Sequence, residues 1–312
     1  MRHVVSAIQG LLALLLATAA AAQGAKPLSK CAPDAVLSGS VCMDKYEASV
    51  WRVSDPNGVN LTLVTKIRQG NATLTDLLAG ARQLGTVDDY APCSDGGQDC
   101  TGLTTTNPKQ DRNIFAVSLA GVAPSAHISW FQAQQACKAS RKRLPSSAEW
   151  QAAAAGTLDP GPDNNATDCN TASTLTPAPA GSRDDCVSLV GAFDMAGNLS
   201  EWVADSVPLS EPPSVTPCGT WSTGDEQCLN GERVETAGPG VLLRGGNAKS
   251  GSGAGPLAIT DAEPDVPTTS TTTTTTTTST TDSSSTSTTT TTSPPTTTTL
   301  PPFTQVGFRC VR

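Results

Sequence analysis

Ten of the 312 residues are cysteines, and no two of them form a C-x-x-C pair. An even number of cysteines in an exported chain is typical of a disulfide framework, whereas in the cytosol it would suggest metal or redox chemistry. Without a C-x-x-C pair, zinc ribbons and thioredoxin-like motifs have no support. Proximity along the chain suggests one connectivity among the many that the sequence permits: Cys31 with Cys42, Cys93 with Cys100, Cys169 with Cys186, Cys218 with Cys228, and Cys137 with Cys310 over a long loop.

The N-terminal residues are typical of a secretory signal. Arg2 and His3 precede an apolar run at 11–16, and a run of small residues at 17–22 ends in an A-x-A site. We expect cleavage after Ala22, which removes residues 1–22. The alternative is a single membrane span, but the apolar run is shorter than the roughly 20 residues that a spanning helix needs. No later stretch is long and apolar enough, so the mature protein is expected to be secreted, periplasmic or at the cell surface.

The charge of the chain argues against nucleic acid as a partner. The net charge is −8, whereas binding to nucleic-acid phosphates needs clustered lysine and arginine side chains. The one basic cluster, residues 141–143, is short and lies beside apolar residues. We expect it to be a solvated helix end with a structural arginine rather than a polyanion site.

A segment rich in Thr, Ser and Pro interrupts the C-terminal part of the chain. It runs from about 265 to 302 and contains eight consecutive threonines at 271–278. Such a composition cannot bury apolar surface and is typical of disordered segments. The ten residues that follow are too few for a domain, but Val306, Phe308 and Cys310 alternate as in a strand. We therefore expect one domain over 23–312 that contains this segment as a long insertion, because the entropy of loop closure grows only as ~(3/2)RT ln n.

Two capping boxes predict two neighbouring helices. Ser129 with Gln132 begins the first helix, and Ser146 with Glu149 begins the second, which is expected to end at Gly156. The turn between them is too short for anything but two packed helices. Elsewhere the chain has short apolar runs and many turn signals. The sequence thus indicates a loop-rich α+β domain with little regular secondary structure, stapled by disulfides.

The glycine-rich stretch LLRGGNAKSGSGAG, residues 242–255, fails both common phosphate-binding patterns. The pattern G-x-x-x-x-G-K-[ST] needs Lys and then Ser or Thr after Gly251, where Ser252 and Gly253 stand. A dinucleotide fingerprint fails too, because Gly251, Gly253 and Gly255 give only G-x-G-x-G. The stretch therefore needs another explanation.

Five ordered motifs supply that explanation. They are VCMDKYEASV (41–50), HISWFQAQQACKASRKRLPSSAEWQAAAAG (127–156), GAFDMAGNLSEWVAD (191–205), LLRGGN (242–247) and VGFRCVR (306–312). In this order they resemble the landmarks of the formylglycine-generating enzyme family, also called sulfatase-modifying factors. The resemblance covers the chain from about Cys42 to Arg312 apart from the Thr-rich insertion. It implies the C-type-lectin-like FGE-sulfatase fold, and it implies a disulfide between the first helix and the terminal GFRC strand, here Cys137 and Cys310.

The resemblance also implies a calcium site in the G-N-x-x-E-W segment. Family members bind Ca²⁺ there through a side-chain amide, backbone carbonyls and a carboxylate, and hard oxygen ligands of this kind suit Ca²⁺. A second family site would involve Asn170. The alternative is that the segment only hydrogen-bonds its own turn while Trp202 packs inside, which would also make glycosylation of its N-x-S sequon unfavourable. The residues that would form the first site are Gly197, Asn198, Leu199 and Glu201.

The same resemblance raises doubt that this chain performs the reaction of the family. Family members oxidise a substrate cysteine to formylglycine with O₂ and copper(I) held by two thiolates, which are the soft ligands that copper(I) selects. Those two positions fall on Ser250 and Gly255, and the serine of the family's R-G-G-S falls on Asn247. No cysteine lies between Cys228 and Cys310, and the implied disulfide occupies Cys310. Copper is therefore not an expected cofactor.

The sequence also lacks the residues that two other reactions would need. A cousin branch, the ergothioneine-type sulfoxide synthases, holds iron with three histidines, but only His127 remains once the signal is removed. His127 could act as the base of a hydrolase, yet no G-x-S-x-G context accompanies it. An iron-dependent sulfoxide synthase and a hydrolase are therefore both disfavoured.

We expect a non-catalytic binding or surface-interaction module, monomeric, with a peptide, glycan or protein ligand. Sites on variable loops of a rigid scaffold commonly set such functions. The alternative is a formylglycine-generating-type oxidoreductase that acts on protein cysteine with non-standard ligands. The binding loop would contain Arg244, which is expected to hold the turn, together with Asn247 and Ser250. Tryptophan rings could stack on carbohydrate, although several of them stand in motifs where packing in the core is the better expectation. The tryptophans are Trp51, Trp130, Trp150, Trp202 and Trp221.

Overall fold

The computed structural model describes residues 30–55, 57–58, 60–85, 113–126, 128–158, 163–172, 174–208, 219–228, 239–262 and 305–312. The segment 1–22 that is expected to be a signal, the Thr-rich segment 265–302 that is expected to be an insertion, and His127 lie outside these residues. So do Cys93, Cys100, Cys218 and the side chain of Cys228, which carry two of the suggested disulfides. Within the described ranges, no helix is long and apolar enough to cross a membrane.

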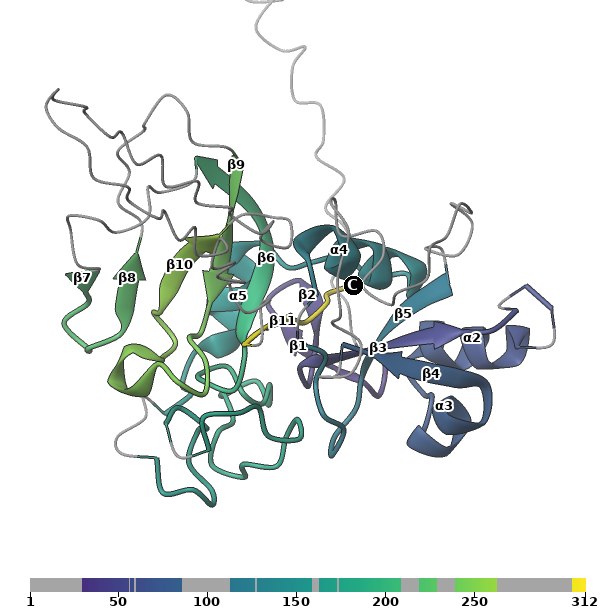
Figure 1. The fold of residues 1–312 in the computed structure, drawn as a ribbon, viewed down its shortest axis with the longest axis horizontal. Helices are drawn as coiled ribbons and strands as arrows, with labels where there is room; N and C mark the ends of the chain where they lie inside the picture. Colours follow the sequence, from purple (N-terminus) through teal and green to yellow (C-terminus); the bar gives the residue numbers. More distant parts are fainter. Residues whose placement is uncertain are drawn as a thin grey trace, which may run out of the picture.

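The described residues form three β-sheets and four α-helices, which confirms the α+β class (Figure 1). The six-stranded sheet has the order β11-β6-β9-β10-β8-β7, with bounds Val306–Phe308, Ser200–Pro208, Pro239–Arg244, Ile259–Ala262, Glu226–Cys228 and Gly219–Thr220. The three-stranded sheet has the order β4-β3-β5, with bounds Ala81–Leu84, Ala48–Val53 and Ile114–Ser118. The third sheet is an antiparallel pair of β1 (Ala35–Ser38) and β2 (Val41–Asp44).

The helices connect these sheets into a shared core. Helices α2 (Leu61–Gln69) and α3 (Leu74–Gly80) lie beside the three-stranded sheet, while α4 (Trp130–Ala139) packs on β5 and α5 (Ser147–Ala154) packs on β6 (Figure 1). The largest apolar cluster joins Val50 of β3, Ala136 of α4 and Leu243 of β9. Both larger sheets therefore bury side chains against the same helix.

Both helices predicted from capping boxes are present. The Ser129 and Ser146 hydroxyls accept from the backbone N–H groups of Gln132 and Glu149, at 3.3 and 3.2 Å, and the Gln132 and Glu149 side chains accept in return. Helix α5 ends at Ala154, just before the expected Gly156. These local signals therefore fixed where each helix begins.

The prediction for the basic cluster at 141–143 was wrong for its central residue. Lys142 is buried and forms ion pairs of 2.6 and 2.5 Å with Asp34 and Asp44. Arg143, by contrast, is half-exposed and pairs with Glu149. Lys142 is buried because two carboxylates from the β1–β2 region compensate its charge, which the local sequence does not reveal.

The chain returns to the core after the insertion as a C-terminal strap, residues 305–312. Strand β11 pairs in parallel with β6, and Cys310 forms a disulfide with Cys137 of α4, with Cα atoms 5.7 Å apart. Val311 then bridges to Arg143 and Met43. The predicted terminal strand and the implied disulfide are both present, although the strand ends at Phe308, before the cysteine.

Two further disulfides of the suggested set are present, Cys31–Cys42 and Cys169–Cys186. Of the five tryptophans, Trp51, Trp150 and Trp202 are fully buried, as core packing predicts. Trp221 differs, because 41% of it is exposed.

Candidate functional site

The glycine-rich loop begins where β9 ends and turns back on itself. Gly245 and Gly246 both have left-handed backbones, with φ of +89° and +69°, which side chains rarely adopt. A Cβ on Gly246 would also lie 2.6 Å from the Cα of Ala254. The N–H of Gly255 donates to the carbonyl of Gly245 at 3.0 Å, which closes the loop. The two glycines thus allow residues 246–255 to fold into a compact unit at the end of the sheet.

Arg244 anchors this loop to the core. Its guanidinium lies 5.0 Å from the centre of the Trp150 ring, and it donates to Gln151 and to the carbonyl of Pro256. Burial lowers the pKa of Arg244 to about 10. Trp150 in turn donates its indole N–H to Glu201 at 2.7 Å. Arg244 is therefore placed to hold the turn rather than to contact a ligand.

Asn247 and Ser250 shape the tip of the loop. The Asn247 side chain donates to the Ser200 hydroxyl at 3.1 Å and accepts from the N–H of Lys249 at 3.0 Å. The Ser250 hydroxyl accepts from the N–H of Asn247 at 3.0 Å. Both residues therefore fix the backbone, and a short 3-10 helix, η3 (Gly251–Gly253), follows them.

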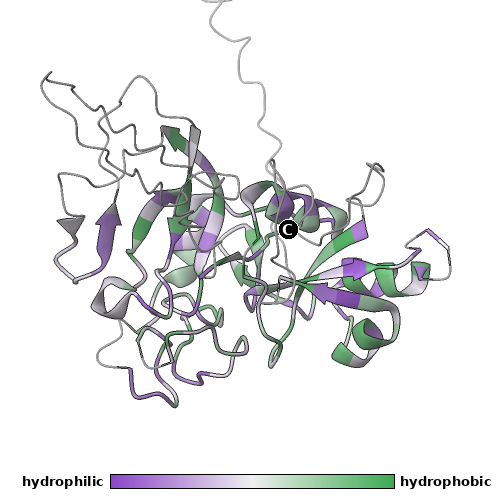
Figure 2. Cartoon of the chain, in the orientation of Figure 1, coloured by the Kyte–Doolittle hydropathy of each residue, from purple (hydrophilic) through white to green (hydrophobic). Residues whose placement is uncertain are grey.

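The loop forms one wall of an open pocket of about 580 Å³. The opposite wall comes from β7 and β8 at the outer part of the six-stranded sheet, where Figure 2 shows β8 in the hydrophilic colour. Among the residues that the structure describes, every side chain that lines the pocket is polar, and the rest of this lining is glycine backbone. The lining residues are Gly219, Thr220, Gly224, Glu226, Asn247, Lys249, Ser250, Ser252, Gly253 and Gln305.

The two positions that the resemblance assigns to copper thiolates are both engaged in other contacts. Ser250 bonds to the loop backbone, as described above. A Cβ on Gly255 would lie 2.4 Å from Oδ2 of Asp225. Asp225 is fully buried, and this Oδ2 accepts from the N–H of Leu257 at 2.6 Å. A carboxylate therefore fills the space that a side chain at position 255 would need.

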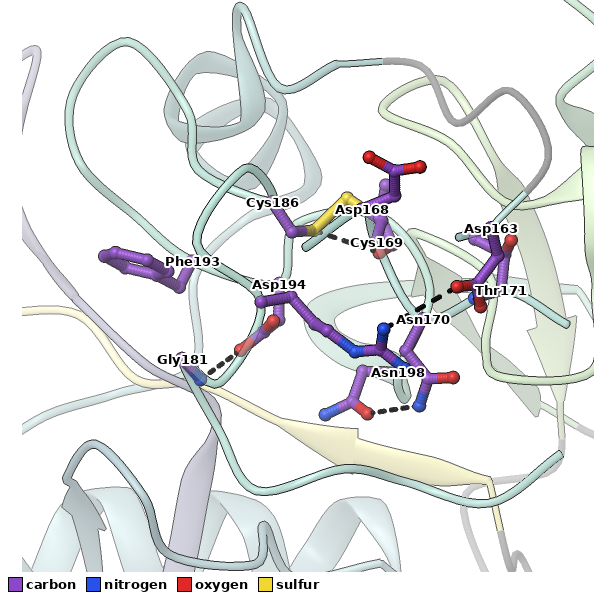
Figure 3. The surroundings of a disulfide bond; sticks show 12 residues. Asp163, Asp168, Cys169, Asn170, Thr171, Gly181, Cys186, Phe193, Asp194 and Asn198 are labelled. Atoms are coloured by element: carbon purple, nitrogen blue, oxygen red, sulfur yellow. Dashed lines mark hydrogen bonds and ion pairs between the residues drawn. A yellow bond between two sulfur atoms is a disulfide. The ribbon is translucent and has the colours of Figure 1, made fainter. Parts of the chain in front are cut away.

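The predicted calcium segment lies directly beside the glycine-rich loop. The N–H of Gly197 donates to the carbonyl of Gly245 at 3.0 Å, and the N–H of Ala248 donates to the carbonyl of Asn198 at 3.1 Å. Asn198 is buried, and its side-chain oxygen accepts from Asn170 at 3.0 Å, so the two amides point toward each other (Figure 3). The structure thus brings together Asn170, the G-N-x-x-E-W segment and the R-G-G loop.

Two residues that the sequence interpretation did not single out complete this region. Glu47 accepts from the Asn198 side chain and from the N–H of Leu199, the latter at 3.0 Å. Burial, reinforced by the charges of Asp194 and Glu201, raises the pKa of Glu47 well above its usual range. Arg309 donates to both carboxylate oxygens of Glu201, at 2.5 and 2.7 Å. Glu47 lies in the first motif and Arg309 in the last, so the motifs themselves contained the signal.

The calcium site stays a prediction. Both oxygens of Glu201 contact the charged guanidinium of Arg309, so coordination of an ion by Glu201 would require this pair to open. The oxygen of the Asn198 side chain already accepts from Asn170 and from the N–H of Ala178. Metal analysis of the wild type and of Glu201→Ala tests the assignment, and equal calcium content in both would reject Glu201 as a ligand.

Comparison with known families identifies the family of this chain. The profile of the sulfatase-modifying factor enzyme 1-like domain family, FGE-sulfatase, matches residues 86–312. No curated protein matches the chain by sequence.

Similar solved structures include two variants of the Major Tropism Determinant and one protein named CarF. The P3c variant is 16% identical with a TM-score of 0.40, over 92% of this chain and 54% of that one. The M1 variant is 16% identical with a TM-score of 0.38, over 92% and 54%. CarF is 13% identical with a TM-score of 0.36, over 87% and 85%. The chain thus spans about half the length of the two tropism determinants.

Proposed function

Because the chain belongs to the sulfatase-modifying factor enzyme 1-like domain family and has its C-type-lectin-like fold, we propose that it is an exported binding module without the family's copper site. Its ligand binds in the pocket between the loop 246–255 and strands β7 and β8. Catalysis by copper and O₂ is not part of this function.

One observation carries the proposal, namely the position of Asp225 under Gly255. Copper(I) in this family needs a thiolate there, and a thiolate needs a Cβ. The nearest atoms to such a Cβ would be the carboxylate atoms of Asp225, at 2.4 to 2.5 Å. Asp225 is buried and accepts a hydrogen bond from the N–H of Leu257, so a shift of its carboxylate would weaken this contact. This supports the proposal that a buried carboxylate occupies the place where other family members hold the metal.

The pocket supports the second half of the proposal. Arg244, Asn247 and Ser250 hold the loop through buried or partly buried contacts, so the pocket wall is formed before any ligand arrives. A preformed site avoids part of the entropy cost of ordering a loop on binding. Polar groups on such a wall are available for specificity.

The oxidoreductase alternative is tested directly. The purified protein is incubated with copper(I), O₂ and a sulfatase-type C-x-P-x-R peptide, and the peptide mass is followed. We expect no change of mass. A mass loss that corresponds to conversion of the cysteine to an aldehyde, and that a copper chelator abolishes, would overturn the proposal.

Thiol counting gives an independent test. Five disulfides from ten cysteines leave no thiol for copper, so we expect no titratable thiol in the native protein. A pair of titratable thiols would reopen the copper mechanism.

A further inference from the structure

We propose that the pocket beside the loop 246–255 binds a neutral saccharide, with Trp221 at its rim as the surface on which a sugar ring stacks. This inference rests on the proposed function, which makes this pocket the ligand site. It adds the chemical class of the ligand.

The chemistry of the described lining residues argues against an apolar ligand. Side-chain amides come from Asn247 and Gln305, and hydroxyls come from Thr220, Ser250 and Ser252. Pockets for apolar ligands and cofactors are lined mainly by hydrophobic and aromatic side chains, and the described residues of this lining include none. A ligand rich in hydroxyl groups matches a wall of amides and hydroxyls, because each of its groups can both donate and accept.

The charges of the pocket favour a neutral ligand. Lys249 and Glu226 contribute one positive and one negative side chain to the lining. Recognition of phosphate or sulfate groups needs clustered cations, and the chain as a whole carries a net charge of −8. The described lining residues therefore do not offer the cluster of positive charge that an anionic polymer or a nucleotide would need.

An exposed tryptophan, Trp221, directly follows one of the lining residues in the chain. Trp221 directly follows Thr220, and the tight turn that it begins is closed by Gly224, whose N–H donates to the Trp221 carbonyl at 2.9 Å. Thr220, which precedes this turn, and Gly224, which closes it, both line the pocket. Trp221 is the most exposed of the five tryptophans, at 41%. A large flat ring that stays in water beside hydroxyl-binding groups suits the C–H face of a sugar.

An extended peptide suits the site less well. Addition of a peptide strand needs a free sheet edge with a row of unpaired backbone groups. Within the described residues, the outer strand of this sheet, β7, consists of Gly219 and Thr220. The described part of this edge thus offers few main-chain partners to a peptide.

The experiment uses saturation-transfer difference NMR and tryptophan fluorescence on the full mature chain. The probes are three neutral trisaccharides, chitotriose, mannotriose and maltotriose, together with an anionic heparin disaccharide and the C-x-P-x-R peptide. We expect at least one neutral trisaccharide to give saturable transfer and to change the tryptophan emission, and the heparin disaccharide to give none. Trp221→Ala is expected to weaken this binding by about three- to tenfold.

Two matched variants test the location. Ser252→Trp places a large side chain in the pocket and is expected to abolish saccharide binding. Ser54→Trp makes the same exchange at an exposed position after β3, in the other part of the molecule, and is expected to bind like the wild type.

The outcomes separate the two proposals. If none of the three trisaccharides binds, the saccharide assignment is overturned. If Ser252→Trp binds as well as the wild type, or Ser54→Trp loses binding equally, the location is overturned. If only the peptide binds and Ser252→Trp blocks it, the saccharide class fails while the binding function survives. Copper-dependent oxidation of the peptide would instead defeat the proposed function itself.

Discussion

Three contacts between side chains connect the glycine-rich loop to the centre of the molecule. Arg244 stacks on Trp150, Trp150 donates to Glu201, and Glu201 pairs with Arg309 of the C-terminal strap. The last three of these residues are fully buried. Because each contact positions the next residue, the geometry of the loop depends on an ion pair at the core.

Position 255 gives the sharpest prediction for a single residue. In Gly255→Ala the new Cβ would lie 2.4 Å from Asp225, so the buried carboxylate must shift and its bond to Leu257 weakens. We expect the free energy of unfolding to fall by about 1–3 kcal/mol, measured by urea denaturation. Gly253→Ala is the matched control, because its Cβ would meet nothing closer than 3.5 Å. Equal stability of the two variants would contradict the assignment of Asp225 as the occupant of this space.

The buried pair of Arg309 and Glu201 gives a larger effect. Arg309→Met would leave the Glu201 carboxylate buried with no charge to compensate it, which costs about 3–5 kcal/mol in comparable cases. We expect a loss of stability of this size in urea denaturation. Lys66→Met, at the exposed pair with Asp76, is the control and should change the stability little. Wild-type stability in Arg309→Met would show that the pair contributes nothing to the fold.

At the scale of residues, the sequence motifs contain residues of the candidate site but do not reveal the contacts between them. The motifs drew attention to Arg244, Asn198 and Glu201, which lie in or beside the candidate site. They did not reveal that Arg309 is the partner of Glu201 or that Asp225 lies under Gly255, because these partners are 108 and 30 residues apart in the chain. Such contacts follow from tertiary packing, on which local spacing carries no information.

At the scale of elements, helix starts were predictable where capping side chains follow the common pattern. Helices α4 and α5 begin with Ser and have Gln or Glu three residues later. Helix α3 has a capping box too, but with Asp76 in the last position, and the Asn60 side chain makes no cap bond for α2. Strands of two to six residues with mixed burial carry little periodic signal, so most of the sheet order could not be predicted.

The start of α5 makes a prediction about pH. Hydrogen bonds from Arg143, aided by those of the Ser146 cap, lower the pKa of Glu149 to about 2. A carboxylate with a lowered pKa stabilises the fold above its unfolded pKa of about 4.3 and loses this contribution as the pH falls toward 2. Because the pair is partly exposed, the contribution is expected to be below about 1 kcal/mol.

Urea denaturation between pH 2 and pH 6 tests this point. The stability of the wild type should fall more steeply with decreasing pH than that of Glu149→Gln, in which the group cannot titrate. Curves of equal slope would reject the contribution of Glu149.

At the scale of the whole molecule, the last eight residues hold distant segments together. The strap pairs with β6, joins α4 through Cys137–Cys310, and reaches Asp34 near the start of β1 through Arg312 at 2.8 Å. The sequence allowed a return of the chain to be predicted, because ten residues after the insertion are too few to fold alone. It could not show that the strap bridges β2 and the turn between α4 and α5 at Val311.

The strap should therefore stay in place when the chain is cut before it. We expect a specific protease site placed within 271–278 to be cleaved without loss of the folded state, because strand pairing, two ion pairs and one disulfide hold residues 305–312. Under denaturing conditions without reductant, the C-terminal fragment should remain attached, and reduction should release it, as intact-mass analysis would reveal. In a variant with Cys137→Ser and Cys310→Ser the fragment should separate on denaturation alone.

Release from the cut wild type without reductant would mean that this disulfide is not formed. Loss of folding on cleavage would mean that the covalent path through the insertion, rather than the contacts of the strap, maintains the core.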